Sequence, residues 1–473
     1  MLPDSEEKQA DYLSRYMLLC AASGALEGAW WGPLICHREG LVDDGKRPYP
    51  ALERITHYAS IEGGRDDLRV RPALHALRAF AGLIPGARYE GRLNATEGLE
   101  VHAFRSATHL IHAAWTINGR AAALADLYSS GDLAQAEFLS RDGVTEAASD
   151  ASRMLVGESP RYLRWPVSGS ACLRPGAALL RDVVIAWHQP GRRHFHFREG
   201  NWQGIVIAGS LDEANRLLET IHPDRLLTPS REAALRHARN AIWTLPDPRR
   251  PDAKLVVKQP VKMHFHKKLL DRFKPSKGLR SWSGTCELLR HGIGVATPVA
   301  WFEWRGDTTL LRNYYVCEHV RADFAVREML AAFARGEPEF AGVTEDDAYR
   351  QLCDYLLRMH GCGIFFRDLS GGNILATKTA DGTLSFNLID TGRIHAFGVP
   401  LPMGKRLADM VRICNKLDGR GRDKLMALYM ARLGRRFGGW SKLQFPLYDL
   451  KVSLKRSLGR QGMKRLKACV RGQ

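Results

Sequence analysis

The 473-residue sequence lacks the cysteine spacing of a metal-binding or disulfide-stabilised scaffold. Its nine cysteines are odd in number, and no two of them are separated as Cys-x-x-Cys. Zinc knuckles and disulfide frameworks depend on such paired spacings. We therefore expect reduced, mostly buried thiols, as in a cytoplasmic protein.

A long uncharged hydrophobic run is also missing. Glu27 interrupts the best candidate, Met17–Ile35, so that no segment reaches the roughly 18 apolar residues of a membrane span. The acidic segment Asp4–Glu7 is unlike the basic start of a signal peptide. We expect a cytoplasmic chain without a membrane-spanning helix.

The positive charge is concentrated near the carboxyl end. The net charge is +18, and Leu401–Gln473 holds 19 Lys and Arg residues but only four acidic ones. Such a segment attracts polyanions, meaning a phosphorylated glycolipid, an anionic membrane surface or nucleic acid. The alternative is a solvated helical face that only aids solubility. Because no recognition helix or stacking platform is evident, we expect no specific nucleic-acid partner.

The patterns along the chain predict an α+β protein in four parts. A small β-rich domain is expected at 87–166, and a β-rich followed by an α-rich lobe at 167–320 and 321–473. The resemblance of the amino-terminal third, given below, implies that 1–86 is a partial (β/α) barrel end. Periodicity predicts helices at Glu6–Ala22 and Pro72–Leu83. Apolar runs predict strands at Ala29–Cys36 and Val183–Trp187. They also predict a hairpin of Asn240–Leu245 and Lys254–Lys258 across the turn Pro246–Pro251.

Three polar side chains near position 380 carry the strongest chemical signal. Asp368 and Asn373 are five residues apart in a turn before a β-run, and Asp390 follows a second β-run. Phosphoryl transfer needs a carboxylate that faces the acceptor hydroxyl, which Asp368 supplies. It also needs oxygen ligands for Mg²⁺, which Asn373 and Asp390 supply. This spacing resembles the catalytic loop and metal-binding Asp of protein-kinase-like enzymes.

Upstream residues follow the order of the same fold. Lys258 ends Leu-Val-Val-Lys, where the resemblance implies a contact with ATP phosphates, and Glu287 is its predicted ion-pair partner. Tyr314–Val320 resembles the hinge that receives adenine, which implies cofactor contacts by Glu318 and Val320. Arg367 completes the predicted catalytic set beside Asp368.

More specifically, the region from about Val183 onward resembles the lipopolysaccharide core heptose and Kdo (3-deoxy-manno-octulosonic acid) kinases. The residues that carry this resemblance are Trp202-Gln-Gly, Trp282–Glu287, Arg290–Ala300, Phe366-Arg-Asp, Leu388–Arg393 and Lys405–Arg412. The resemblance implies a cytoplasmic, ATP- and Mg²⁺-dependent kinase that phosphorylates a sugar hydroxyl. The basic segment fits an anionic glycolipid or core-glycan substrate and peripheral contact with the inner membrane leaflet.

Two departures leave alternatives open. No glycine occurs from Ser210 to Lys277, so the usual glycine-rich phosphate loop is missing and a different turn, around Ser230–Arg231, must contact the phosphates. Phe366 replaces the expected histidine of the catalytic loop. A catalytically weak or inactive pseudokinase that binds glycan or membrane is therefore the second hypothesis. A Ser/Thr protein kinase is disfavoured because no Ala-Pro-Glu follows Asp390.

The amino-terminal third resembles a different family. Residues Glu6–Leu77 are similar to the last helices and strand of a (β/α)8 glycoside hydrolase, and Ala87–Trp165 to the small β-domain that follows such barrels. A barrel needs eight strands, and glycoside hydrolysis needs two opposed carboxylates. In the resembling enzymes the nucleophilic glutamate would lie just upstream of the helix that starts here near Glu6. We therefore expect no glycosidase activity, and either a remnant sugar-binding or docking module fused to the kinase-like part, or a truncated gene product whose barrel lies upstream.

Overall fold

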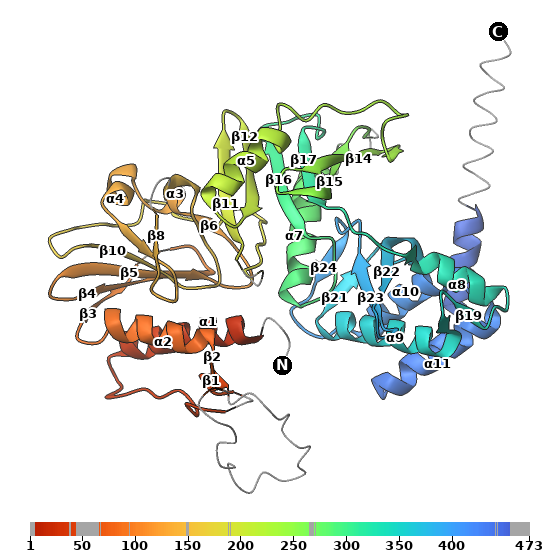
Figure 1. Ribbon diagram of the computed structural model, residues 1–473, viewed down its shortest axis with the longest axis horizontal. Helices are drawn as coiled ribbons and strands as arrows, with labels where there is room; N and C mark the ends of the chain where they lie inside the picture. Colours follow the sequence, from red (N-terminus) through yellow and green to blue (C-terminus); the bar gives the residue numbers. More distant parts are fainter. Residues whose placement is uncertain are drawn as a thin grey trace, which may run out of the picture. The chain divides into compact units, whose positions relative to one another are not determined.

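The computed structural model describes residues 5–36, 39–43, 66, 68–93, 95–147, 151–187, 189, 191–263, 269, 271–439, 441 and 443–454. They form two compact units (Figure 1). Unit 1 consists of Met1–Gly292 and Pro298–Cys317, and unit 2 consists of Ile293–Thr297 and Glu318–Gln473. The last part of the basic segment, 455–473, lies outside the described residues. The α+β class is confirmed, whereas the four-part division of the chain stays a prediction.

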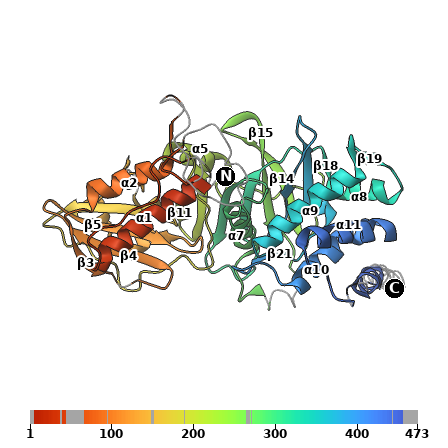
Figure 2. The same ribbon diagram turned by 90° about the horizontal axis from the view of Figure 1, so that it is seen from below.

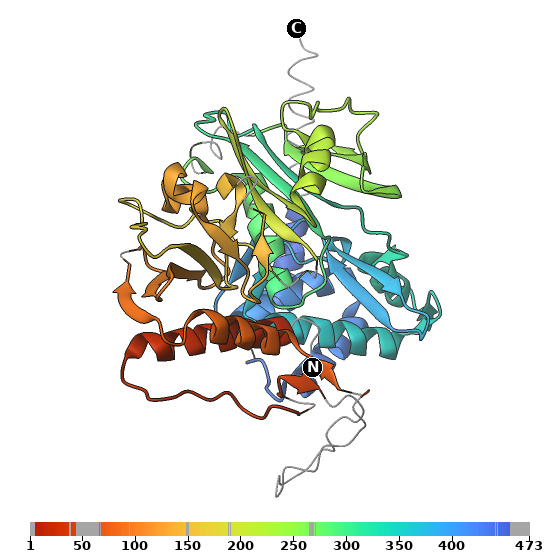
Figure 3. The same ribbon diagram turned by 60° about the vertical axis from the view of Figure 1, so that its left-hand side comes forward.

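The amino-terminal part of unit 1 is an antiparallel sheet with two helices on one face. Both predicted helices are confirmed, as α1 (Ser5–Ser23) and α2 (Pro72–Leu83). The strands, in spatial order, are β3 (Arg88–Arg92), β4 (Leu99–Arg105), β5 (His109–Thr116), β10 (Arg161–Pro166), β7 (Glu137–Leu139) and β8 (Thr145–Glu146). Figures 2 and 3 show α1 and α2 alongside each other, where Leu18 and Ile84 pack against Phe104 and Ile111 of the sheet.

Short elements complete this part of unit 1. They are β1 (Val42–Asp43), β2 (Arg69–Val70), β6 (Ala122–Ala123), α3 (Leu124–Leu127), α4 (Ser130–Ala134) and β9 (Leu155–Val156). The strand predicted at Ala29–Cys36 is wrong, because only Ile35 makes an isolated bridge, to Val42. Gly32 and Pro33 interrupt this run, and proline has no N–H for a ladder.

The second sheet of unit 1 has seven antiparallel strands. In spatial order they are β11 (Arg193–Glu199), β12 (Trp202–Ala208), β16 (Pro298–Trp304), β17 (Asn313–Glu318), β15 (Arg250–Pro260), β14 (Asn240–Asp247) and β13 (Arg236–His237). The predicted hairpin of β14 and β15 is confirmed. The strand predicted at Val183–Trp187 is wrong: Val184 makes one isolated bridge, and its carbonyl accepts the indole N–H of Trp282.

Two helices cover opposite faces of this sheet (Figure 1). On one face, Ala214 and Leu217 of α5 (Leu211–Ile221) belong to the same core cluster as Tyr314. On the other face, the next residue, Tyr315, shares a hydrogen bond of 2.9 Å with Thr285 of α7 (Lys277–Arg290). Since side chains alternate along a strand, these neighbours mark the two faces.

Unit 2 combines helices with short antiparallel strands in small sheets of two or three strands (Figure 1). Its helices are α8 (Val326–Ala334), α9 (Glu345–Gly361), α10 (Met403–Ile413) and α11 (Gly419–Leu433). Its strands are β18 (Phe324–Ala325), β19 (Glu339–Phe340), β20 (Val343–Thr344), β21 (Ile364–Phe366), β22 (Ile374–Lys378), β23 (Leu384–Leu388) and β24 (Ile394–Ala396). Across the described ranges, no helix has both the length and the hydrophobicity to cross a membrane.

The close packing of β12 on β16 gives a test of the seven-stranded sheet. A Cβ atom at Gly204 would collide with the carbonyl oxygen of Trp301, whereas one at Gly82 in α2 would meet no atom within 4 Å. We expect Gly204→Ala to lower the free energy of unfolding by about 1–3 kcal/mol. The matched variant Gly82→Ala should raise it by up to about 1 kcal/mol. Denaturant unfolding would measure both changes. Equal free energies of unfolding for the two variants would contradict the close approach of Gly204 to the Trp301 carbonyl.

Candidate active site

Unit 2 brings the three predicted polar residues to one end of two strand pairs. Phe366 at the end of β21 faces Ile394 at the start of β24, and Ile374 at the start of β22 faces Leu388 at the end of β23. Because both pairs are antiparallel, the connections that leave them at these ends lie together. Asp368 and Asn373 lie in the connection from β21 to β22, and Asp390 lies in the connection from β23 to β24.

Hydrogen bonds tie these two connections to each other. The amide Nδ2 of Asn373 donates to the backbone oxygen of Asp368 at 2.8 Å, which fixes the predicted pair in one loop. The backbone N–H of Ile389 donates to the carbonyl of Asn373 at 3.0 Å. Arg393 Nη1 lies 2.6 Å from Asp368 Oδ1, in an ion pair that the sequence did not indicate. Asp368, Asn373 and Asp390 are thus held in one neighbourhood.

Asp390 has a strained backbone. Its φ angle is 61°, in the left-handed region that L-residues other than glycine rarely adopt, although aspartate tolerates it better than most. Strained backbone conformations of this kind cluster at ligand-binding and catalytic positions. The exposed side chain of Asp390 fits that pattern.

The donor chemistry of this neighbourhood suits Mg²⁺. Because the nitrogen of the Asn373 amide donates within the loop, its oxygen Oδ1 remains as the ligand atom. The carboxylate of Asp390 is a second hard oxygen donor. Among the described residues, no group of three or more His, Cys, Asp and Glu side chains is arranged to hold a metal. Two protein oxygens are the number expected for an Mg²⁺ ion whose other ligands are phosphate oxygens and water.

A buried carboxylate of α10 anchors the loop that carries Asp368. Asp409 is completely buried, and its Oδ2 accepts the backbone N–H of Phe366 at 3.0 Å. Its Oδ1 accepts from Arg412 Nη1 at 2.9 Å. A charge buried in this way persists only when paired and hydrogen-bonded. The role of Asp409 was missed in the sequence, although an aspartate between Leu407 and Met410 on an apolar helix face was a usable signal.

His360 lies beside this carboxylate at the end of α9. Its Nε2 is 3.5 Å from Asp409 Oδ2, and its Nδ1 is 2.6 Å from the hydroxyl of Tyr429. Burial lowers the pKa of His360, even though the neighbouring Asp409 acts in the opposite direction. Burial thus favours the neutral form of this imidazole, which lies beside the carboxylate that accepts the Phe366 N–H.

Lys258 and Glu287 both belong to unit 1, on β15 and α7. Leu255 and Val257 point into the core on the α5 face, so Lys258 lies on the face that α7 covers. Glu287 forms ion pairs with Arg290 at 3.0 Å and His291 at 3.3 Å. Burial alone would raise the pKa of Glu287, but these two partners outweigh it and lower the pKa. The Lys258–Glu287 pair stays a prediction.

The remaining predicted residues lie in unit 2. The backbone N–H of Glu318 donates to the carbonyl of Thr297 at 2.8 Å, and Val320 is half-buried two residues later. Arg367 is exposed, and its backbone N–H donates to the carbonyl of Arg393 at 3.3 Å. The roles of Glu318, Val320 and Arg367 stay predictions.

The glycine-free region forms a tight hairpin. Strands β13 and β14 pair through Arg236–Ile242 and His237–Ala241, so that Ala238, Arg239 and Asn240 connect the last pair. The turn predicted to contact phosphates, Ser230–Arg231, precedes β13, where Ser230 Oγ accepts the backbone N–H of Ala233 at 3.3 Å. Its contact with a nucleotide stays a prediction.

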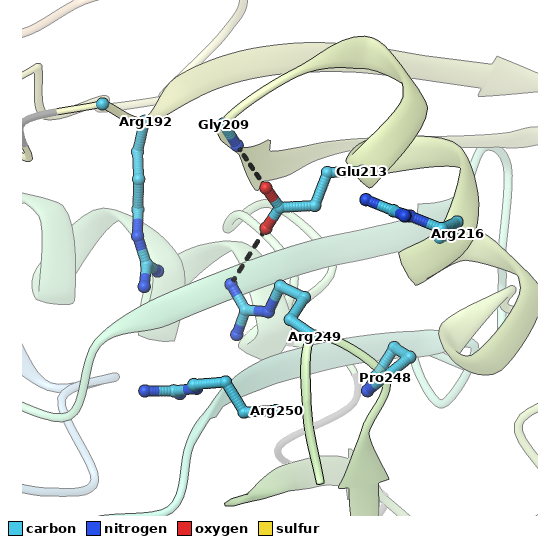
Figure 4. A pocket seen from close by; sticks show the side chains of 8 residues that line it. Arg192, Gly209, Glu213, Arg216, Pro248, Arg249 and Arg250 are labelled. Atoms are coloured by element: carbon cyan, nitrogen blue, oxygen red, sulfur yellow. Dashed lines mark hydrogen bonds and ion pairs between the residues drawn. The ribbon is translucent and has the colours of Figure 1, made fainter.

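A separate cavity of about 420 Å³ in unit 1 is rich in arginine. The residues that line it are Gly191, Arg192, Gly209, Glu213, Arg216, Pro248, Arg249 and Arg250. Figure 4 shows Glu213 accepting from the Gly209 backbone N–H and facing Arg249, at distances of 3.0 and 3.9 Å. Buried Asp247 accepts from Nε and Nη2 of Arg249, both at 2.9 Å, and from Arg250 at 3.2 Å. Two of the lining arginines, Arg249 and Arg250, thus stabilise the β14–β15 turn through their bonds to Asp247.

Replacing Asp409 tests the loop anchor. We expect Asp409→Ala to lower the free energy of unfolding by about 3–5 kcal/mol, because Arg412 and the Phe366 N–H lose a buried acceptor. Asp409→Asn should lose less, since its amide oxygen still accepts from Phe366. The exposed Asp423→Asn is the control. Wild-type stability of the alanine variant in denaturant unfolding would refute the anchor.

The Asp247 turn predicts a defined pH dependence. Burial alone would raise the pKa of Asp247, but hydrogen bonds from Arg249 and Arg250 lower it overall. Its contribution to stability is therefore complete above the unfolded pKa and is lost as the pH falls through the lower, folded pKa.

We expect Asp247→Asn to be about 2–4 kcal/mol less stable than the wild type at neutral pH. The difference should narrow below about pH 4, where the unfolded carboxylate takes up a proton while the folded one still resists protonation. Denaturant unfolding as a function of pH measures this, with exposed Glu219→Gln as the control. A difference that does not change with pH would contradict the ion-pair explanation.

Comparison with known proteins assigns no family. No protein-family profile and no curated protein matches the sequence. Solved structures do match, among them one described as WaaP in complex with acyl carrier protein. It is 16% identical, with a TM-score of 0.34, and the match covers 52% of this chain and 91% of that one. A likeness at this level does not assign an activity or a substrate.

Proposed function

We propose that the protein is an ATP- and Mg²⁺-dependent kinase that phosphorylates a sugar hydroxyl of lipopolysaccharide core, on heptose or Kdo, or of a related envelope glycan. The observation that carries the proposal is the neighbourhood of Asp368, Asn373 and Asp390. A base candidate and two hard oxygen donors stand on two connections joined by hydrogen bonds. This is the set of groups that phosphoryl transfer requires.

In this proposal Asp368 is the catalytic base. Its carboxylate takes the proton of the sugar hydroxyl while the hydroxyl oxygen bonds to the γ-phosphorus and the bond from that phosphorus to the β–γ bridging oxygen breaks. Asn373 Oδ1 and the Asp390 carboxylate would hold Mg²⁺, which supplies charge neutralisation on the phosphates when bound. Lys258 would contact the phosphates, and Glu318 and Val320 the adenine, as the sequence order predicts.

The acceptor is proposed to be an anionic glycan rather than a protein. The chain passes from β24, which ends at Ala396, to α10, which begins at Met403, and has no Ala-Pro-Glu after Asp390. That leaves little room for the long segment with which protein kinases receive a peptide. The net charge of +18 supports an acceptor that already carries negative charge.

A pseudokinase that binds glycan without transferring phosphate is the second candidate. The observation that favours it is the β13–β14 hairpin, whose three-residue connection contains no glycine to bring backbone N–H groups close to phosphates. Nucleotide binding separates the candidates. A kinase must bind Mg·ATP, whereas this alternative need not.

Transfer of labelled phosphate tests the proposal directly. The full chain is incubated with γ-labelled ATP, Mg²⁺ and dephosphorylated lipopolysaccharide core, beside a generic protein acceptor. We expect label on the glycan with the wild type and a loss of at least about a hundredfold with Asp368→Asn, because the base is removed. Since Asp368 is partly exposed, the variant should fold normally. Asp423→Asn, an exposed carboxylate in α11, should keep wild-type activity.

Two results would reject the kinase. Equal labelling by wild type and Asp368→Asn would mean that another group, or a contaminant, performs the transfer. Absence of label on either acceptor, with no thermal shift on addition of Mg·ATP, would favour the pseudokinase.

A further inference from the structure

The last described helical segment, 443–454 in unit 2, has two unlike faces. On one face, Asp449 accepts from Asn415 at 3.0 Å and from Arg422 at 2.7 Å. On the same face, the Arg422 guanidinium lies 5.7 Å from the ring centre of Phe445. Since Phe445, Asp449 and Val452 are only partly exposed, this face packs on the body of unit 2.

The opposite face is a stripe of exposed leucines. Leu443, Leu447, Leu450 and Leu454 are 51%, 63%, 57% and 50% exposed. With 3.6 residues per turn, their spacing of four, three and four places them within an arc of roughly 60°. Asp449 lies roughly opposite this arc. Four half-exposed leucines in one line are a patch that marks an interaction surface rather than scattered surface hydrophobes.

The charge around the stripe favours one class of partner. Lys451 is exposed on the same segment, and the sequence from 455 to 473 adds seven Lys and Arg residues and no acidic residue. A helical face of leucines bordered by cations is the pattern of helices that lie in the surface of an anionic bilayer. Apolar side chains enter the acyl boundary while cations remain among the headgroups.

A second copy of the chain fits less well. A coiled coil needs its apolar seam over three to four heptads, whereas the leucine spacing continues onto Ser457, Gln461 and Lys464. Two such basic segments would also repel each other. The sequence pattern and the charge thus both oppose self-association through the stripe.

We propose that the leucine stripe of 443–454 docks unit 2 onto a lipid surface that carries anionic headgroups. The inference is independent of the proposed kinase activity, because it depends only on the two faces of this segment and on its charge. It assigns membrane contact to four named leucines and leaves the basic residues to select the lipid.

Vesicle sedimentation of the full chain tests the docking surface. We expect binding to phosphatidylcholine vesicles that contain phosphatidylglycerol, and at least about tenfold weaker binding to pure phosphatidylcholine. Replacing Leu447→Gln together with Leu450→Gln should weaken binding to the anionic vesicles by at least about tenfold. The matched control, Gln444→Ser with Ser453→Gln, changes exposed polar positions outside the stripe and should bind as the wild type does.

Equal binding by the leucine variant, with folding confirmed by its thermal transition, would overturn the proposal. Equal sedimentation of the wild type with pure phosphatidylcholine vesicles and with vesicles that contain phosphatidylglycerol would also overturn it. If the wild type is a dimer in analytical ultracentrifugation and the leucine variant a monomer, the stripe is a self-association surface and the proposal is wrong. No nucleotide is present, so these results are separate from the outcome of the transfer assay.

Discussion

The hydrogen bond from the Phe366 backbone N–H to the buried carboxylate of Asp409 is the constraint on which the candidate site depends. Leaving a charged carboxylate inside unit 2 without partners would be costly, so the partners must hold their positions. Arg412 occupies the second oxygen, and α10 carries the carboxylate on a rigid helix. The connection that begins after Phe366 thus starts from a fixed point, and Asp368 lies two residues beyond it.

This anchor changes the meaning of Phe366. Replacing the expected histidine removes a side-chain hydrogen bond that would orient the loop, which was a reason to consider an inactive protein. The anchor to Asp409, however, uses the backbone N–H of residue 366, which every residue except proline possesses. The phenylalanine ring is itself completely buried. Loop position is therefore secured by a backbone bond and by apolar packing, so Phe366 alone is weak support for the pseudokinase.

Local patterns predicted the parts of the fold that depend on local spacing. The helices Pro72–Leu83 and Ser5–Ser23, and the β14–β15 hairpin, follow from periodicity and turn residues. Asp368 and Asn373 were found because they are five positions apart in one loop. The incorrect strand predictions at Ala29–Cys36 and Val183–Trp187 depended on apolar composition alone. A strand forms only where a neighbouring strand provides backbone hydrogen bonds. The Val184 carbonyl instead accepts the indole N–H of Trp282.

Contacts between residues that are far apart in the sequence could not be predicted from local patterns. Arg393 pairs with Asp368 across 25 residues, and Asp409 reaches Phe366 across 43. Glu287 illustrates the same limit: Arg290 connects it to Glu158, at 3.0 and 2.7 Å, in the part of unit 1 that precedes the seven-stranded sheet. That network ties α7 to the turn before β10. The amino-terminal region is thus bonded to α7, the helix that carries Glu287. This contact argues that the region contributes to the structure of unit 1 and is not merely a remnant.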